Sequence, residues 1–161
     1  MKKLILVRHG KSSWEENLPD EDRPLAKRAY ADAELVLKAF RNHVPESLHM
    51  WSSPANRALS TARIFQNNLR IPDERFKIKE DLYTFNVNHL LKVIFGCNDS
   101  VENLMVFGHN PALTQLVNTL GDHPFDNVPT TGLNVLEFES DSWRTIKNGK
   151  NTLYLFPKHL R

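Results

Sequence analysis

Two histidines and two arginines have the side-chain chemistry of a phosphate site. Arg8 and His9 are adjacent near the start of the chain, Arg57 lies in its first half, and His109 lies in its second half. A guanidinium group matches phosphate oxygens with paired hydrogen bonds, and a neutral imidazole can attack phosphorus as a nucleophile. If folding brings these four side chains together, they have the composition of a phosphoryl-transfer pocket that needs no metal ion.

Short apolar runs precede each of these residues and predict the strands that must position them. The runs are Leu4–Val7, Leu48–Trp51 and Asn103–Phe107, and each is followed by turn residues and then by a helical pattern. Continuous apolar runs of this length are typical of strands that are buried on both faces of a parallel sheet. Because ligands bind at the carboxyl ends of such strands, we expect the four side chains to converge at one edge of the sheet.

Apolar residues at helical spacing predict the helices. The first helix is expected within residues 24–45 with Asp22 as a possible N-cap, and the second within residues 54–68, with Ser53 as its cap and Pro54 in its first position. The same periodicity predicts two further helices, each followed by a glycine, at Val87–Phe95 and Ala112–Leu120.

The remaining apolar segments predict further strands. Phe76–Lys79 is expected to be a short strand, and the last part of the chain to form strands at Leu133–Phe138, Trp143–Lys147 and Thr152–Phe156, with a hairpin turn at Asn148-Gly149. Strands that alternate with helices predict an α/β fold: a three-layer α/β/α sandwich with a mostly parallel central sheet. We expect a single domain over residues 1–161.

Composition excludes several classes of protein. The chain has 161 residues, of which 40% are hydrophobic and 25% charged, as is usual for globular domains. The 21 Lys and Arg residues against 19 Asp and Glu give a net charge of +2, which argues against a dedicated nucleic-acid surface. Cys97 is the only cysteine, and no run is long and apolar enough for a membrane span or a signal peptide. We therefore expect a cytoplasmic protein that binds neither nucleic acid nor membranes.

Four motifs in their order along the chain resemble the histidine phosphatase superfamily, also called phosphoglycerate mutase-like, and within it the small SixA-type branch of phosphohistidine phosphatases. The resemblance covers nearly the whole chain. It rests on Leu6–Ser12, which contains Arg-His-Gly, on Arg23-Pro24-Leu25, on Ser52–Ala62 and on Gly108–Pro111.

The resemblance implies that His9 is the nucleophile that becomes phosphorylated and that Arg8, Arg57 and His109 bind the equatorial phosphate oxygens. It also implies a covalent phosphohistidine intermediate, which water hydrolyses, with no cofactor and no metal. For attack, His9 must present a neutral ring nitrogen, so we expect its other nitrogen to donate to a backbone carbonyl or a carboxylate. Arg23 is implied to lie near the pocket rim, and we expect Ser12 to form hydrogen bonds in the pocket.

A carboxylic acid usually protonates the leaving group in this superfamily, and Glu80 is the candidate here. The adjacent Asp81 is an alternative, and no side chain need act as the acid if the leaving group is good. An imidazole leaving group has a pKa of about 6.5, whereas an alcohol depends on protonation. A weak acid position would therefore favour phosphoramidate substrates.

The resemblance to the small branch implies hydrolysis of phosphohistidine on a phosphotransfer or phosphocarrier protein. The length of residues 62–108 agrees with this prediction, because it leaves no room for an elaborate cap over the site. One alternative is a phosphatase for a small phosphomonoester such as a sugar phosphate or nucleotide. An alternative of another class is a non-catalytic phosphoprotein-binding module. Trp14 could line the entrance or only pack, and Cys97 is expected to be a structural thiol.

Overall fold

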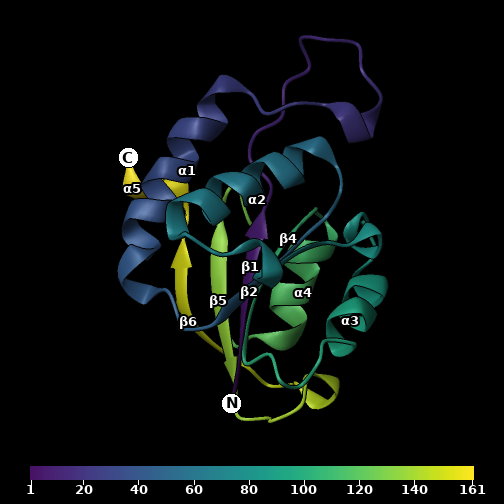
Figure 1. The fold of residues 1–161 in the computed structure, drawn as a ribbon, viewed down its shortest axis with the longest axis vertical. Helices are drawn as coiled ribbons and strands as arrows, with labels where there is room; N and C mark the ends of the chain where they lie inside the picture. The colour runs from purple at the N-terminus through teal and green to yellow at the C-terminus, as the bar shows by residue number, and fades with distance from the viewer.

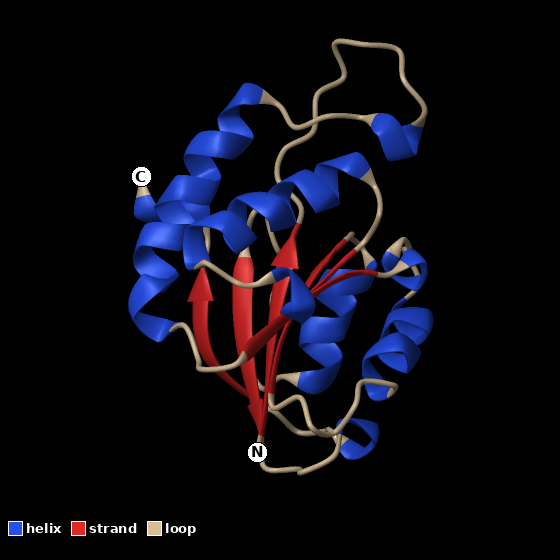
Figure 2. Cartoon of the chain, in the orientation of Figure 1, coloured by secondary structure: helices blue, strands red, loops and turns tan.

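A computed structural model describes residues 1–161 and contains one six-stranded sheet with the strand order β3-β2-β4-β1-β5-β6 (Figures 1 and 2). Neighbouring pairs among β1 to β4 are parallel, and β5 runs antiparallel to both β1 and β6. Five strands therefore point one way and β5 alone the other, which confirms the predicted mostly parallel sheet. The strands are β1 (Lys2–Arg8), β2 (Leu48–Ser52), β3 (Phe76–Ile78), β4 (Asn103–Gly108), β5 (Leu133–Phe138) and β6 (Lys150–Leu155).

Helices cover both faces of the sheet and complete the three layers (Figure 1). One face carries α1 (Lys27–Phe40), α2 (Asn56–Leu69) and the short α5 (Pro157–Leu160), and the other carries α3 (Val87–Phe95) and α4 (Ala112–Leu120). No helix combines the length and the apolar character that a membrane crossing requires. Short 3-10 helices lie at Asp20–Asp22, Arg41–His43, Asp73–Arg75, Glu80–Leu82 and Trp143–Thr145.

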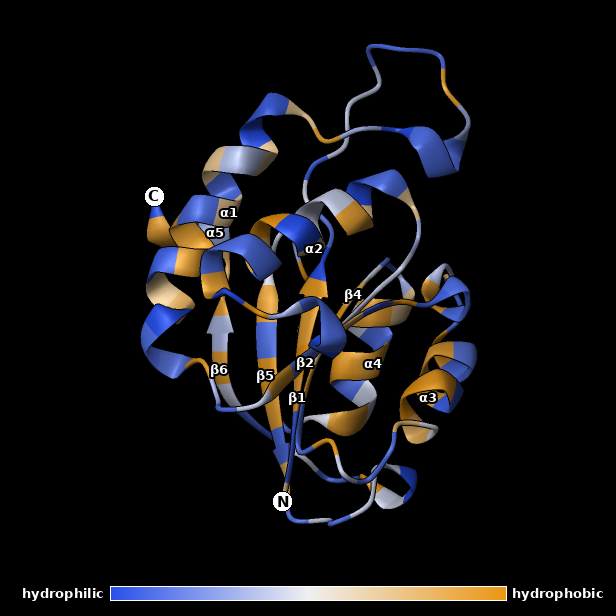
Figure 3. Cartoon of the chain, in the orientation of Figure 1, coloured by the Kyte–Doolittle hydropathy of each residue, from blue (hydrophilic) through white to orange (hydrophobic).

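The central strand β1 separates two hydrophobic cores. Leu4 and Leu6 point into the core beneath α3 and α4, whereas Ile5 and Val7 point into the core beneath α1 and α2. This alternation follows from the period of two residues along a strand, and all four side chains are fully buried. The hydropathy colouring shows the apolar strands enclosed between the helices (Figure 3). The apolar run 4–7 was therefore correctly interpreted as a strand buried on both faces.

Both expected helix caps were wrong. Asp22 lies in a 3-10 turn, and a bridge between Ser12 and Leu25 keeps the next residues extended, so α1 begins only at Lys27. Pro54 does not occupy the first position of α2, which begins at Asn56. The Ser53 hydroxyl accepts the backbone N–H of Ala55, which precedes α2, at 3.2 Å. It is also hydrogen-bonded to the ring of His109, which follows the neighbouring strand β4, a contact that the local sequence could not indicate.

The strand expected at Trp143–Lys147 was also wrong. Trp143 begins a 3-10 helix and is fully buried, with its indole N–H donating to the Val101 carbonyl at 2.7 Å. The Asp99 carboxylate accepts the backbone N–H of Trp143 at 2.9 Å. These bonds hold Trp143 against the loop before β4. Residues 143–147 therefore form no strand, and β6 pairs with β5 instead of forming a hairpin with them.

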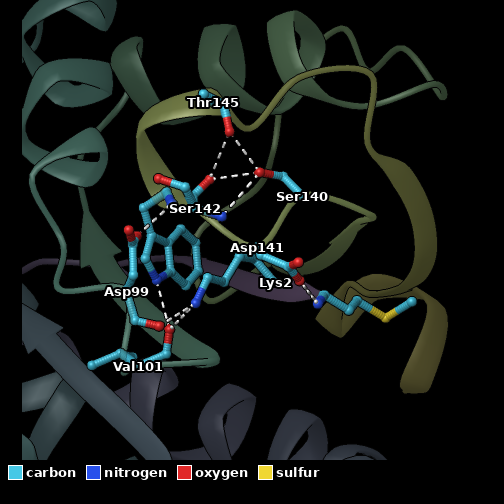
Figure 4. Close-up of polar contacts among 9 residues, drawn as sticks. Lys2, Asp99, Val101, Ser140, Asp141, Ser142 and Thr145 are labelled. Atoms are coloured by element: carbon cyan, nitrogen blue, oxygen red, sulfur yellow. Dashed lines mark hydrogen bonds and ion pairs between the residues drawn. The ribbon is translucent and has the colours of Figure 1, made fainter.

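Lys2 fixes this end of the sheet through a buried ammonium group (Figure 4). The residue is 2% exposed, and Nζ donates to the carbonyl oxygens of Asp99 and Val101 and lies 5.7 Å from the centre of the Trp143 ring. A buried charge is tolerated only when hydrogen bonds satisfy it. Lys2 thus links β1 to the loop between α3 and β4.

Replacement of Lys2 with alanine is expected to lower the free energy of unfolding by about 2 kcal/mol, because two buried carbonyls lose a charged donor. Urea denaturation followed by circular dichroism would measure this change. Lys3→Ala is the matched control: Lys3 is the next residue on β1, is only half-buried, and makes no side-chain hydrogen bond. Equal losses for the two variants would contradict the assigned role of Lys2.

Candidate active site

A cavity of about 300 Å³ lies beside the carboxyl ends of β1 and β4. Twelve residues line it. They include six of the seven residues that the sequence singled out: Arg8, His9, Ser12, Arg23, Arg57 and His109. The expected convergence of these side chains at one edge of the sheet is therefore what the structure shows.

His9 follows β1 directly and is 8% exposed. Its Nδ1 lies 2.7 Å from the Gly10 carbonyl oxygen. A carbonyl can only accept, so Nδ1 carries the proton and Nε2 keeps its lone pair. Burial and, to a smaller extent, the positive charges of Arg57, Arg8 and Arg23 together lower the pKa of His9 to about 4, against the Gly10 hydrogen bond, which raises it. The ring is therefore neutral at pH 7, as a nucleophile must be.

Gly10 allows α1 and α2 to approach this loop closely. A Cβ atom at this position would lie 2.9 Å from Ala29 Cβ and 3.1 Å from Leu25 Cδ2. The Gly10 N–H donates to the Thr61 hydroxyl at 2.9 Å, and that hydroxyl donates to the Arg57 carbonyl at 2.7 Å. A larger residue would push apart the contacts that join the His9 loop to α2.

Three arginines surround the cavity, each held by a different element. Arg8, at the end of β1, donates to the Val128 carbonyl at 2.9 Å. Arg57, in the first turn of α2, is 2% exposed. Arg23 is 7% exposed and donates to the Ser12 hydroxyl. Because arginine stays protonated at working pH, the cavity is strongly cationic.

His109 follows β4 and is 1% exposed. Its ring lies 5.2 Å from the His9 ring, and its Nε2 lies 2.8 Å from the Ser53 hydroxyl. Burial lowers the pKa of His109 to about 3, with His9 and Arg57 adding to the effect. The side chain of the next residue, Asn110, accepts the backbone N–H of Thr114 at 3.0 Å, which supports the first turn of α4.

Asp20 is the carboxylate of the site, and the sequence analysis missed it. Its oxygens accept hydrogen bonds from Arg57 at 3.0 Å and from Arg23 at 3.1 Å, and also from the Tyr83 hydroxyl. The Tyr83 bond is the largest cause that lowers the pKa of Asp20 to about 2, and the two arginines add to it, against partial burial. No local signal marks Asp20, because its partners Arg57 and Tyr83 lie far along the chain.

Glu80 and Asp81 do not reach the cavity. Both side chains are exposed, and neither lines it. Glu80 begins the 3-10 helix Glu80–Leu82, and the residue of this stretch that does reach Asp20 is Tyr83. The acid role expected for Glu80, or for Asp81 as the alternative, therefore has no support in this geometry.

Four buried nitrogen atoms at this site have no hydrogen-bond partner. They are Nε of Arg8, Arg23 and Arg57, and Nδ1 of His109. Buried polar atoms are almost always satisfied in folded proteins, so such a cluster needs an explanation. A tetrahedral oxyanion would bring several acceptor oxygens and negative charge to the same place. The arrangement is that of an oxyanion site with a neutral imidazole beside it.

Comparison with known proteins gives a family match. The model of the histidine phosphatase superfamily (branch 1) matches residues 4–89, which is more than half of the chain. The uncharacterized protein Rv1276c of Mycobacterium tuberculosis is 27% identical over 153 residues, which cover 89% of this chain and 93% of that protein.

Solved structures of similar fold cover the whole length. The protein histidine phosphatase SixA complexed with tungstate aligns with a TM-score of 0.82 and 19% identity, covering 99% of each chain. A putative phosphohistidine phosphatase SixA from Nakamurella multipartita, printed as multipartitia, aligns with a TM-score of 0.79 and 19% identity, covering 97% of this chain and 96% of that one. These likenesses confirm the predicted fold.

The imidazole resonances of His9 and His109 are expected not to titrate between pH 5 and pH 8. Their folded-state pKa values of about 4 and about 3 lie below the ordinary value of 6.5. The unfolded chain takes up these protons near pH 6.5, whereas the folded chain does so only near pH 4 or below. The free energy of unfolding therefore falls as the pH drops from about 6.5 to about 4. NMR titration, with assignment by His9→Asn and His109→Asn, would measure this. A midpoint near 6.5 for either ring would contradict the prediction.

Replacement of Asp20 with asparagine is expected to tighten tungstate binding about 5- to 10-fold, because removing one negative charge beside an anion site is worth about 1 kcal/mol. Isothermal calorimetry would measure the affinity. Asp22→Asn is the control, since Asp22 is exposed and its carboxylate has no partner. Weaker tungstate binding by the Asp20 variant would instead show that the carboxylate acts mainly by orienting the arginines.

Proposed function

The chain belongs to the histidine phosphatase superfamily, and on that premise we propose that it hydrolyses phosphohistidine on a protein through a phosphoryl group carried by His9. One observation carries the proposal: the proton of the His9 ring is held on Nδ1 by the Gly10 carbonyl, in a ring that lines a cationic cavity. That arrangement leaves Nε2 as a free nucleophile at neutral pH.

The first step transfers the phosphoryl group to the enzyme. The Nε2 lone pair of His9 attacks phosphorus, the bond from phosphorus to the substrate nitrogen breaks, and its electron pair stays on the substrate imidazole, which leaves as the neutral ring after taking up a proton from solvent. Arg8 and Arg57 stabilise the charge on the equatorial oxygens, which is the main source of catalysis in such reactions. Because both side chains are held by hydrogen bonds, little reorganisation is needed.

The second step releases phosphate. Water attacks the phosphoryl group on His9, the bond from phosphorus to Nε2 breaks, and the ring nitrogen recovers its lone pair. Asp20, the ionised carboxylate of the cavity, can orient this water by accepting a hydrogen bond from it, and because a carboxylate with a pKa of about 2 is a weak base, the protons of the water pass to the released phosphate and to solvent. Inorganic phosphate and the original form of His9 result.

The low pKa of Asp20 favours a nitrogen leaving group over an alkoxide. Its pKa of about 2 means that the free site has no protonated carboxylic acid at pH 7, and Glu80 lies outside the cavity. An imidazole departs without strong acid assistance, because its own pKa is about 6.5, whereas an alkyl alcohol does not. The site is therefore better suited to phosphohistidine than to sugar or nucleotide phosphates.

The surroundings of the cavity suit a protein substrate. The segment between α2 and β4 forms only β3, two 3-10 helices and α3, and α3 packs beside α4 on one face of the sheet (Figure 1). No helix from this segment covers the cavity. The short length of the segment led us to expect that it would form no elaborate cap. A phosphorylated side chain on a folded surface can therefore approach His9 from outside.

Incubation with a histidine phosphotransfer domain phosphorylated by phosphoramidate is expected to label His9 transiently and to release phosphate. Rapid quench and intact-mass analysis would detect the phosphoenzyme, and kcat/KM for His9→Ala is expected to fall by about 10³-fold or more, because the nucleophile is lost. Arg57→Lys is a second variant: it keeps the charge but loses the fork geometry, and a fall of about 10²-fold is expected.

The comparison substrate is para-nitrophenyl phosphate. Labelling by the aryl phosphate but not by the phosphorylated domain would favour the small-phosphomonoester alternative. Binding of the phosphorylated domain with no label and no turnover would identify a phosphoprotein-binding module. Either result overturns the proposed function.

A further inference from the structure

We infer that the segment Ser13–Asp22, called the arm below, and two exposed aromatic rings at the cavity mouth form a docking surface for a phosphoprotein whose phosphorylated residue is flanked by lysine or arginine side chains. The inference rests on the proposed function, because it takes the cavity to be the phosphate site. It adds the kind of protein surface that the enzyme selects.

The arm is a projecting loop that is held at both ends. At its base Ser13 N–H donates to the Pro24 carbonyl at 2.8 Å, beside the bridge between Ser12 and Leu25. Near the C-terminal end of the arm, Asp20 accepts hydrogen bonds from Arg23, Arg57 and Tyr83. The arm therefore stands in a defined position above the carboxyl ends of the strands, where Figure 1 shows it as the purple loop that extends furthest from the sheet.

The arm is acidic along its whole length. Glu15, Glu16, Glu21 and Asp22 are exposed, and none of the four carboxylates forms an ion pair. No lysine or arginine lies within the arm. Its ribbon is mostly hydrophilic in Figure 3. A strongly cationic cavity thus has a strongly anionic projection beside it.

Two exposed aromatic rings line the mouth of the cavity. Trp14 is 74% exposed and Phe85 is 50% exposed, and both line the cavity. The Trp14 ring packs against the Arg23 guanidinium at 3.6 Å, and the Phe85 ring lies 5.6 Å from the His109 ring. Exposed apolar groups that gather at one place mark interaction surfaces, and tryptophan is prominent among residues that dominate binding energy.

The charges decide which partner fits. A free phosphate ester approaches as an anion, and the four carboxylates of the arm oppose its approach. A protein that presents a phosphate together with neighbouring lysine or arginine side chains places the phosphate in the cationic cavity and the cations against the arm. Its apolar side chains can cover Trp14 and Phe85. The arrangement therefore selects for a basic surface around the phosphate.

Two stable peptides test this inference. Each carries a phosphonotriazole analogue of phosphohistidine at its centre, flanked in one peptide by lysines and in the other by glutamates. Fluorescence anisotropy with the wild-type protein is expected to show the lysine-flanked peptide binding about 10-fold tighter or more at low salt, and this preference is expected to shrink in high salt, where surface charges are screened. In Glu15→Lys/Glu16→Lys the preference is expected to fall about 5-fold or more, because the two substitutions remove most of the net negative charge of the arm.

Glu34→Lys is the matched control, because Glu34 is an exposed acid on α1 and does not line the cavity. This variant is expected to keep the preference for lysine flanks. Trp14→Ala is expected to weaken both peptides by a larger factor than it weakens tungstate, since tungstate has no side chains to cover the ring.

Three results would overturn the inference: no binding of either peptide, equal affinities in the wild-type protein, or a preference that survives the Glu15→Lys/Glu16→Lys substitutions. The wild-type protein could bind both peptides equally and form a dimer that the Glu15→Lys/Glu16→Lys substitutions dissociate. That result would show that the arm contacts a second copy of the chain. Because the analogue peptides are not hydrolysed, their affinities test docking alone. Failure to label His9 in the turnover experiment would overturn the proposed function and leave the docking result intact.

Discussion

The site depends on three guanidinium groups and two imidazole rings that lie close together in one small cavity. The arginines keep their protons, so the two buried rings can lie beside them only as neutral groups, and burial and the arginine charges together lower both histidine pKa values. Asp20 supplies one negative charge, which leaves a net positive cavity. The same electrostatics that attract an oxyanion therefore also keep His9 in the protonation state that can attack it.

The strand order brings these groups together. β4 lies between β1 and β2, and all three strands are parallel, so their carboxyl ends lie side by side. His9 follows β1, His109 follows β4, and Ser53, which contacts the His109 ring, follows β2. Each side chain comes from the first residues after a rigid strand, where position depends least on loop conformation. The crossover connections through helices then place α2 with Arg57 at the same edge.

The sequence predicted the parts of the site that depend on local order along the chain. A buried strand followed by Arg8 and His9, or by His109, places those side chains at the carboxyl edge of a parallel sheet. Asp20 could not be predicted, since its place depends on a loop that folds back onto residues 37 and 63 positions away. Glu80 was chosen for its place in the chain, but sequence position alone does not give side-chain direction, and it is Tyr83, three residues further on, that donates a hydrogen bond to Asp20.

Asp20 connects the chemistry of the cavity to the surface around it. Its carboxylate binds Arg57 and Arg23, and its backbone belongs to the acidic arm, where its carbonyl accepts a further bond from Arg57 at 2.7 Å. The arm cannot move at this end without changing the partners of an arginine that lines the cavity. Asp20 therefore belongs both to the acidic arm and to the cationic cavity, and the arginines that line the cavity also hold this end of the arm in place.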